Sequence, residues 1–264
     1  MRIICLIKFI PDVENFIYDY EKNVLVRENV RMVLNPDDAS AVAYALKIKD
    51  KNPETYIEVV TMAPQGVMLQ LEDLLRLNVD KATLISDKLY IGSDSYITSM
   101  ILGKYLSGIN FDCILTGTHA LDGDTSHVPA QIAEILHIAQ MSNIVKIEEQ
   151  SFGCDSAVIE VDAEKVFVKY KVVLPAILSL QKESKYKLPF IKYKDIDLYV
   201  RNRIEIIDNE VLGYEQHEVG IRGSLTQVFS TFAKKMDKKD KLVVKNDEEG
   251  INTVFSFLKS KGYV

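Results

Sequence analysis

Four short apolar segments in the first half of the chain constrain its fold more than any other feature. They cover residues 3–7, 56–61, 82–86 and 112–116, and polar and apolar residues do not alternate along them. A strand that is buried on both faces has this pattern, which is typical of a parallel sheet. We therefore expect four parallel strands in the core of the protein.

Amphipathic helices are expected between and after these segments. Apolar residues recur there at intervals of three, four and seven or eight positions, in the sets Ala39/Val42/Ala43/Leu46, Val67/Leu71/Leu74/Leu75, Ile97/Met100/Ile101/Tyr105 and Val128/Ile132/Ile135/Leu136. A fifth strand is expected near 142–147. Strands and helices that repeat at this spacing predict an α/β fold, an open doubly wound parallel sheet of the Rossmann-like kind.

Two departures from this repetition predict inserted hairpins. Residues 16–20 and 24–27 flank a turn-like stretch, and so do residues 157–161 and 166–170. An apolar stretch follows at 172–180. We expect an α/β domain at 1–205 and a C-terminal helical arm at 206–264. The arm has two amphipathic helices, near 225–232 and 251–258, joined by a Lys/Asp-rich linker at 234–241.

Composition excludes several classes of protein. Hydrophobic residues make up 47% and charged residues 27% of the 264 residues, so wholesale disorder is excluded. The net charge of −6 argues against a dedicated nucleic-acid binder, which needs a basic surface. No apolar run approaches the roughly 20 residues of a membrane helix. Cys5, Cys113 and Cys154 lack metal-ligand spacing, and we expect reduced thiols in a cytoplasmic protein.

The carboxyl ends of the predicted strands are the first place to expect a ligand, at the point where strand order reverses. Residues 116–125, after the fourth strand, are small, polar and glycine-containing, and they lead into a helix that Thr125 or Ser126 can cap. Free N–H groups at such a helix start suit a phosphate or pyrophosphate, although an ordinary capped loop has the same pattern. The chain has neither of the standard glycine-rich nucleotide motifs.

A second helix start lies at residues 35–38. Asn35 suits the N-cap position, Pro36 the first helical position and the two acids the first turn, so capping alone explains the pattern. A ligand role requires that this helix start face the crevice. No nucleophile–base pair can be recognised elsewhere. That absence fits a protein whose chemistry belongs to a bound cofactor.

Six blocks of the chain together carry a family resemblance, at residues 6–12, 35–38, 61–64, 117–125, 174–176 and 219–226. In their order and spacing they resemble the beta subunit of electron transfer flavoprotein. The resemblance covers nearly the whole chain and is strongest up to about residue 147. The Asp-Gly-Asp-Thr loop at 122–125 is specific in combination with the other blocks.

The resemblance implies a heterodimer with an alpha subunit that carries FAD, in which this chain supplies an adenine-nucleotide-binding domain. Its nucleotide would be AMP in an electron shuttle, or a second FAD that takes electrons from NADH. By bifurcation, one electron would then reach ferredoxin or flavodoxin. The other would pass through the alpha-subunit FAD to a flavin-dependent dehydrogenase, such as an acyl-CoA dehydrogenase. The Asp-Gly-Asp-Thr loop and Met62-Ala63 favour FAD. A nucleotide-binding module without a redox role is the remaining alternative.

Carried over residue by residue, the resemblance assigns the nucleotide contacts but no catalytic or metal-binding residue. The contacts fall on Leu6, Ile7, Lys8, Asn35, Pro36, Asp37, Asp38, Met62, Ala63, Gly117, Thr118, Asp122, Gly123, Asp124, Thr125, Ser126, His127 and Val128. The phosphates would lie at 125–128, where Gly123 lets the backbone approach closely.

The resemblance also assigns a partner-docking residue, Leu188. It lies in the stretch 182–203, which holds seven Lys and Arg residues and three acids, and we expect an exposed leucine anchor there. The chain departs from the family pattern at His119, where the family usually has Gln, at Pro129-Ala130, and at Leu225, where a proline is expected. The family's arginine and glycine before residue 174 have no clear match. These departures concern the phosphate side of the site and the central hairpin.

Overall fold

The structure is a computed structural model that describes residues 1–12, 18–19, 24–25, 31–226 and 243–263. The chain divides into two compact units, Met1–Gln227 and Val228–Val264. The predicted boundary after residue 205 falls inside β13 (Ile204–Ile207), which pairs with a central strand of the first unit. In this division, residues 206–226 fall in the first unit.

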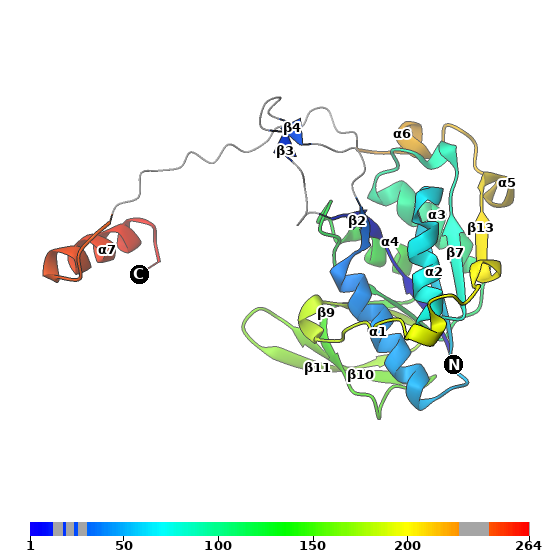
Figure 1. The fold of residues 1–264 in the computed structure, drawn as a ribbon, viewed down its shortest axis with the longest axis horizontal. Coiled ribbons are helices and arrows are strands. Elements are labelled where there is room, and N and C mark those ends of the chain that lie inside the picture. The colour runs from blue at the N-terminus through cyan, green and yellow to red at the C-terminus, as the bar shows by residue number, and fades with distance from the viewer. Residues whose placement is uncertain (13–17, 20–23, 26–30, 227–242, 264) are drawn as a thin grey trace. The chain divides into compact units, whose positions relative to one another are not determined.

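The first unit is built around a nine-stranded sheet in the order β11-β10-β9-β12-β8-β1-β6-β7-β13 (Figure 1). The seven strands from β9 to β13 are parallel, which confirms the predicted parallel sheet. Their bounds are β1 (Arg2–Leu6), β6 (Tyr56–Met62), β7 (Lys81–Ile85), β8 (Cys113–Gly117), β9 (Ala139–Ile147) and β12 (Ala176–Leu180), besides β13. The predicted hairpin near 157–170 adds β10 (Ser156–Asp162) and β11 (Phe167–Val173), both antiparallel.

Side chains of the central strands point alternately into two separate cores. On β1, Ile3 and Cys5 contribute to one core, whereas Ile4 and Leu6 contribute to the other. Because both faces are buried at residues 3–6, these four positions are all apolar. The four helices predicted between and after the strands are present, as α1 (Pro36–Lys51) and α2 (Met68–Arg76) on the first core and α3 (Ser95–Ser107) and α4 (His127–Leu136) on the second.

Shorter elements complete the first unit. After β1, β2 (Phe9–Pro11) pairs with β5 (Met32–Leu34), and β3 (Tyr18–Asp19) pairs with β4 (Val24–Leu25). This antiparallel pairing confirms the first predicted hairpin, whose turn at 21–23 lies outside the described residues. The remaining elements are η2 (Gln65–Val67), η3 (Lys88–Tyr90), η4 (Lys182–Ser184), η5 (Tyr193–Asp195), η6 (Arg201–Arg203), α5 (Asn209–Leu212) and α6 (Gly220–Gly223). None of the described helices combines the length and the apolar character needed to span a bilayer.

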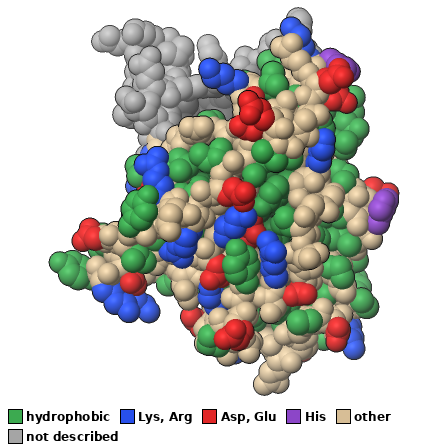
Figure 2. All heavy atoms as spheres, turned by 90° about the vertical axis from the view of Figure 1, so that its right-hand side faces the viewer, with side chains coloured by type: hydrophobic (Ala, Val, Ile, Leu, Met, Phe, Trp, Pro, Cys, Tyr) green, Lys and Arg blue, Asp and Glu red, His purple; other side chains and the backbone are tan. Residues whose placement is uncertain are grey.

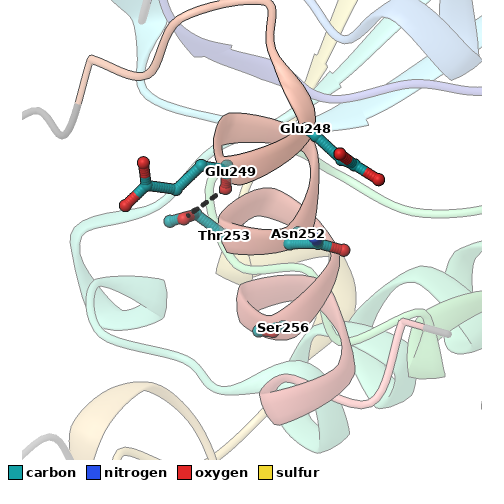
Figure 3. Close-up of a pocket in the computed structure, with 5 residues that line it drawn as sticks. All are labelled: Glu248, Glu249, Asn252, Thr253 and Ser256. Carbon is teal, nitrogen blue, oxygen red and sulfur yellow. Dashed lines mark hydrogen bonds between the residues drawn. The ribbon is translucent and has the colours of Figure 1, made fainter.

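The second unit contains α7 (Glu248–Ser260), which confirms the predicted helix near 251–258. The other predicted arm helix and the linker lie almost wholly outside the described residues. A hollow on α7 is lined by Glu248, Glu249, Asn252, Thr253 and Ser256 (Figure 3). All five come from one helix, so the hollow has no opposing wall and is not a candidate site. Elsewhere on α7, Ile251, Val254, Phe255 and Phe257 are exposed.

Candidate functional site

The order of the parallel strands reverses between β1 and β8. The chain passes from β1 through β6 to β7 on one side, and then crosses back to place β8 on the other side of β1. Ligands bind at such a switch point in open α/β sheets. At this point the carboxyl ends of the strands border a cleft of about 1060 Å³. Sites for drug-sized ligands usually have roughly 300–1,000 Å³, so this cleft can hold a large ligand.

Most of the residues that the resemblance assigned to nucleotide binding line this cleft. They are Leu6, Ile7, Lys8, Asn35, Asp38, Met62, Ala63, Gly117, Thr118, Gly123, Asp124, Thr125, Ser126, His127 and Val128. Pro36, Asp37 and Asp122 are not among the lining residues. The part of the cleft lined by the first set is called the near half below. Whether these residues contact a nucleotide stays a prediction.

The two acids at the start of α1 tie three strand ends together. The carboxylate of Asp38 accepts hydrogen bonds from the N–H of Lys8 after β1 (2.9 Å) and of Gly117 at the end of β8 (2.7 Å). The carboxylate of Asp37 accepts one from the N–H of Lys182 after β12 (3.0 Å). Both carboxylates thus accept hydrogen bonds from the protein's own backbone. We expect them to shape the near half and not to bind a ligand directly.

Asn35 completes this arrangement, and we call Asn35, Asp37 and Asp38 the strand-end clamp. Its amide donates to the carbonyl oxygen of His119 (2.8 Å) and accepts from the N–H of Leu121 (3.3 Å), so it holds the loop that follows β8. Asn35 occupies the N-cap position before Pro36, as predicted, but its side chain makes no capping hydrogen bond. The predicted capping role of this side chain is therefore wrong, because the loop engages its amide instead.

Burial raises the pKa of both acids of the strand-end clamp. Desolvation raises the pKa of Asp38 to about 7, although the N–H groups of Lys8 and Gly117 oppose the change. Desolvation also raises the pKa of Asp37, against the hydrogen bond from Lys182. The side chains of these residues are almost inaccessible to solvent. The two acids therefore repel an anionic ligand less than exposed carboxylates would.

The loop before α4 presents backbone and not side-chain groups to the near half. Asp124 and Ser126 adopt left-handed backbone conformations, with φ of 48° and 54°. Ser126 occupies the N-cap position but makes no side-chain capping hydrogen bond, so the predicted cap does not form there. The N–H groups of the first turn of α4 remain available to a ligand. A Cβ atom at Gly123 would meet no atom within 4 Å, so packing within the protein does not require glycine there.

An ion pair fixes the same loop to the end of β1. The ammonium group of Lys8 lies 2.7 Å from a carboxylate oxygen of Asp122, and both side chains are partly exposed. Asp122 thus contacts Lys8 and does not line the cleft. Lys8 is a cation that the near half offers to a phosphate, and it is already paired with Asp122.

The rest of the cleft, called the far half below, contains none of the nucleotide contacts that the resemblance assigned. Its lining residues lie at or after the ends of β7 and β13 and at the start of α3, and include Ile85, Ser86, Asp87, Lys88, Tyr90, Ile91, Gly92, Ser93, Asp94, Ser95, Thr98, Leu102, Ile206 and Asp208. One signal could have found it. Residues 92–95 form a small, polar, glycine-containing stretch before α3, and Asp94 caps that helix through the N–H of Ile97 (3.0 Å). The loop before α4 has the same sequence pattern.

Leu188 is not the exposed residue that the sequence predicted. It is half-buried and packs against the first core together with Tyr186, whose ring centroid lies 5.0 Å from that of Tyr44. The side chains that protrude are Phe190, 96% exposed, and Tyr193, 93% exposed.

The surface on the side of β13 and α5 carries no extended basic region among its described residues. Figure 2 shows acidic and basic side chains interspersed with apolar ones on this face. Proteins that bind nucleic acid without sequence preference need a continuous basic surface.

Comparison with known proteins identifies the family of the chain. The family model for the electron transfer flavoprotein domain matches residues 22–189, more than half of the chain. The caffeyl-CoA reductase–Etf complex subunit CarD of Acetobacterium woodii is 33% identical over 236 residues, which cover 88% of each chain. An electron transfer flavoprotein subunit beta of Thermoanaerobacterium thermosaccharolyticum is 29% identical over 262 residues, 99% of each chain.

A third relative has a related name. The acryloyl-CoA reductase electron transfer subunit gamma of Anaerotignum propionicum is 26% identical over 268 residues, 99% of each chain. The matches extend over the switch-point cleft and over nearly the whole sequence. The chain belongs to the electron transfer flavoprotein family, and within it to the beta subunits.

Proposed function

We propose that the cleft binds FAD and that the chain works as the beta subunit of a heterodimer with an FAD-carrying alpha subunit. In this proposal, electrons from NADH pass to a flavin-dependent dehydrogenase, such as an acyl-CoA dehydrogenase, and by bifurcation to ferredoxin or flavodoxin. The observation that carries the choice of FAD is the far half of the cleft. AMP needs the near half alone, whereas a dinucleotide needs both.

The residues of the cleft fit the parts of FAD. In the near half, Leu6 and Met62 offer apolar contacts for the adenine, and the uncapped start of α4 offers N–H groups for the pyrophosphate. In the far half, Tyr90, Ile91 and Leu102 offer apolar surface for the flavin ring system. The bound flavin would supply the redox chemistry, while this chain binds and orients it.

The choice of acceptor is supported by the names of two relatives. One is a subunit of a caffeyl-CoA reductase–Etf complex, and another is an electron transfer subunit of an acryloyl-CoA reductase. Both names concern acyl-CoA substrates. We therefore propose an acyl-CoA-specific flavoenzyme as the partner that exchanges electrons with the heterodimer.

Gly123→Val tests the position of the nucleotide. The added side chain would enter the open space beside the start of α4. We therefore expect the affinity for the nucleotide to fall about 10- to 100-fold, which corresponds to the loss of one or more charge-assisted hydrogen bonds. Asp124→Ala and Thr125→Ala should have smaller effects in the same direction. The measurement is acid release of nucleotide from the purified protein, followed by chromatography, which also distinguishes FAD from AMP.

Gly153→Val is the matched control for this experiment. Gly153 is also exposed, and a Cβ atom there would also meet no atom within 4 Å, but this glycine lies in the hairpin region away from the cleft. The substitution should leave nucleotide content and unfolding temperature unchanged. Wild-type nucleotide content in Gly123→Val would rule out this position for the phosphates. Release of AMP alone would favour the structural-AMP shuttle.

We also propose that the basic stretch 182–203 docks the acceptor flavoenzyme through its protruding aromatic residues. Exposed aromatic side chains among lysines combine a hydrophobic anchor with charges that steer a partner. Phe190→Ala with Tyr193→Ala should slow electron delivery about 30-fold or more, the effect of losing a binding hot spot, and leave nucleotide content unchanged. Rapid-mixing kinetics with the purified acceptor measures this rate.

Two control variants separate docking from folding. Phe167→Ala removes another exposed aromatic residue, on β11 and outside the basic stretch, and should leave the rate unchanged. Leu188→Ala should lower the free energy of unfolding by about 1–3 kcal/mol, because Leu188 packs against the core. Equal rates for the double variant and for Phe167→Ala would contradict the docking role.

The apolar residues of α7 are proposed to pack on the alpha subunit. Ile251, Val254 and Phe255 are exposed and recur at helical spacing. A single helix with such an apolar face is not stable in water unless that face packs against another surface. An arm of this kind would bury an obligate interface of roughly 2,000 Å² or more.

A further inference from the structure

His119 lies in the near half of the cleft with its imidazole ring held by a buried acid. The ring atom Nδ1 lies 3.0 Å from Oδ2 of Asp37, and His119 itself lines the cleft. The side chain of His119 is 28% exposed, whereas that of Asp37 is 3% exposed. The ring therefore reaches from the protein interior to the ligand space.

Asp37 fixes the orientation of this ring. The Asp37 carboxylate accepts a hydrogen bond from the backbone N–H of Lys182 (3.0 Å) and a longer one from the backbone N–H of His119 (3.4 Å). With Nδ1 directed at Asp37, the other ring nitrogen, Nε2, faces the loop before α4. The nearest charged atom there is Oδ1 of Asp124 at 3.8 Å, beyond hydrogen-bonding distance. Asp124 is 79% exposed on its side-chain atoms.

The charged groups around His119 come from five elements. They are Asp37 and Asp38 on α1, Lys8 after β1, Asp122 and Asp124 on the loop that also carries His119, His127 on α4, and Glu183 on η4, which acts on Asp37. Lys8 is paired with Asp122, so its charge is partly compensated. Of these acids, Asp37 lies within hydrogen-bonding distance of the ring, whereas Asp124 does not.

We propose that His119 is a ligand-binding residue whose Nε2–H donates a hydrogen bond to a phosphate oxygen of the bound dinucleotide, while Asp37 orients the ring through Nδ1. This inference rests on the proposed function, because it requires a nucleotide in the near half. A hydrogen bond to a charged phosphate contributes to the affinity for the nucleotide, so its removal should weaken nucleotide binding.

The test is a titration of the full-length chain with FAD at pH 7, followed by flavin fluorescence. For His119→Ala we expect the dissociation constant to rise about tenfold relative to the wild type, the effect of losing one charge-assisted hydrogen bond. His119→Gln keeps an N–H donor at this position, and its dissociation constant should lie closer to that of the wild type. Near-ultraviolet circular dichroism verifies that each variant is folded.

A control variant makes the outcome specific to His119. His217→Gln removes an exposed histidine outside the cleft and should keep the wild-type dissociation constant. Wild-type affinity in His119→Ala, or an equal loss of affinity in His217→Gln, would overturn this inference while leaving the nucleotide site in place. Failure of the folded wild type to bind FAD would overturn the proposed function as well.

Discussion

Asp38→Ala should lower the free energy of unfolding by about 2–5 kcal/mol at pH 7. The substitution leaves the buried N–H groups of Lys8 and Gly117 without their acceptor, and each such group destabilises a fold by about 1–3 kcal/mol. Because these groups end β1 and β8, the cleft should lose its shape together with stability. Chemical denaturation followed by circular dichroism measures the change.

Asp50→Ala is the matched control, since Asp50 is an exposed acid on the same helix. It should change stability by less than about 0.5 kcal/mol. If Asp38→Ala changed the free energy of unfolding by less than about 0.5 kcal/mol, the clamp would not hold the strand ends together.

The destabilisation by Asp38→Ala should also depend on pH. Burial raises the pKa of Asp38 to about 7, whereas an unfolded aspartate has a pKa near 3.9. The folded state therefore favours the protonated carboxyl, and this contribution to stability is complete below about pH 4 and is lost as the pH rises through about 7. The difference between wild type and Asp38→Ala should thus be larger at pH 5 than at pH 8, by up to about 3 kcal/mol.

Gly117→Ala should destabilise the protein by about 3 kcal/mol and remove its ability to retain nucleotide. A Cβ atom at Gly117 would lie 2.5 Å from Oδ1 of Asp38, 2.6 Å from Cβ of Asp37 and 2.8 Å from the backbone nitrogen of Asp38. The backbone of α1 would have to move away from β8, and forced shifts of this kind destabilise by about 1–3 kcal/mol or more. Thermal unfolding and acid-released nucleotide report the two effects.

Gly123→Ala is the matched control for Gly117→Ala, because the same methyl group at Gly123 meets no atom within 4 Å. Its unfolding temperature should equal that of the wild type. If the two alanine variants were equally stable, the start of α1 would not be packed against β8 as tightly as these distances require.

The fold could be predicted because burial on both faces leaves a direct signature in the sequence. Residues 3–6 of β1 point alternately into two cores, so this part of the strand is apolar throughout, which indicates a parallel sheet. Isolated polar residues in such strands are harder to interpret. Glu58 on β6 is fully buried and pairs with Arg2 (2.9 Å) and Lys81 (3.2 Å), which come from neighbouring strands. Only the three-dimensional strand order places these charges together.

The candidate site could be predicted in part, because it lies at the ends of strands that the sequence reveals. The near half follows from the rule that ligands bind at the carboxyl ends of strands and from the blocks that resemble the family. The far half depends on how β7, β13 and the start of α3 surround one space, which no local pattern reports. The same holds for Leu188 and Phe190. They lie two positions apart in a basic stretch, and their different burial is decided by the neighbouring core.

The central claim is that this beta subunit holds FAD in its cleft and receives electrons from NADH. The most direct measurement is an anaerobic NADH titration of the purified heterodimer, with the flavins and nucleotides counted after acid release. The account predicts two FAD for each pair of subunits, one of which is bleached at once by NADH. One FAD and one AMP for each pair, with no direct oxidation of NADH, would contradict it.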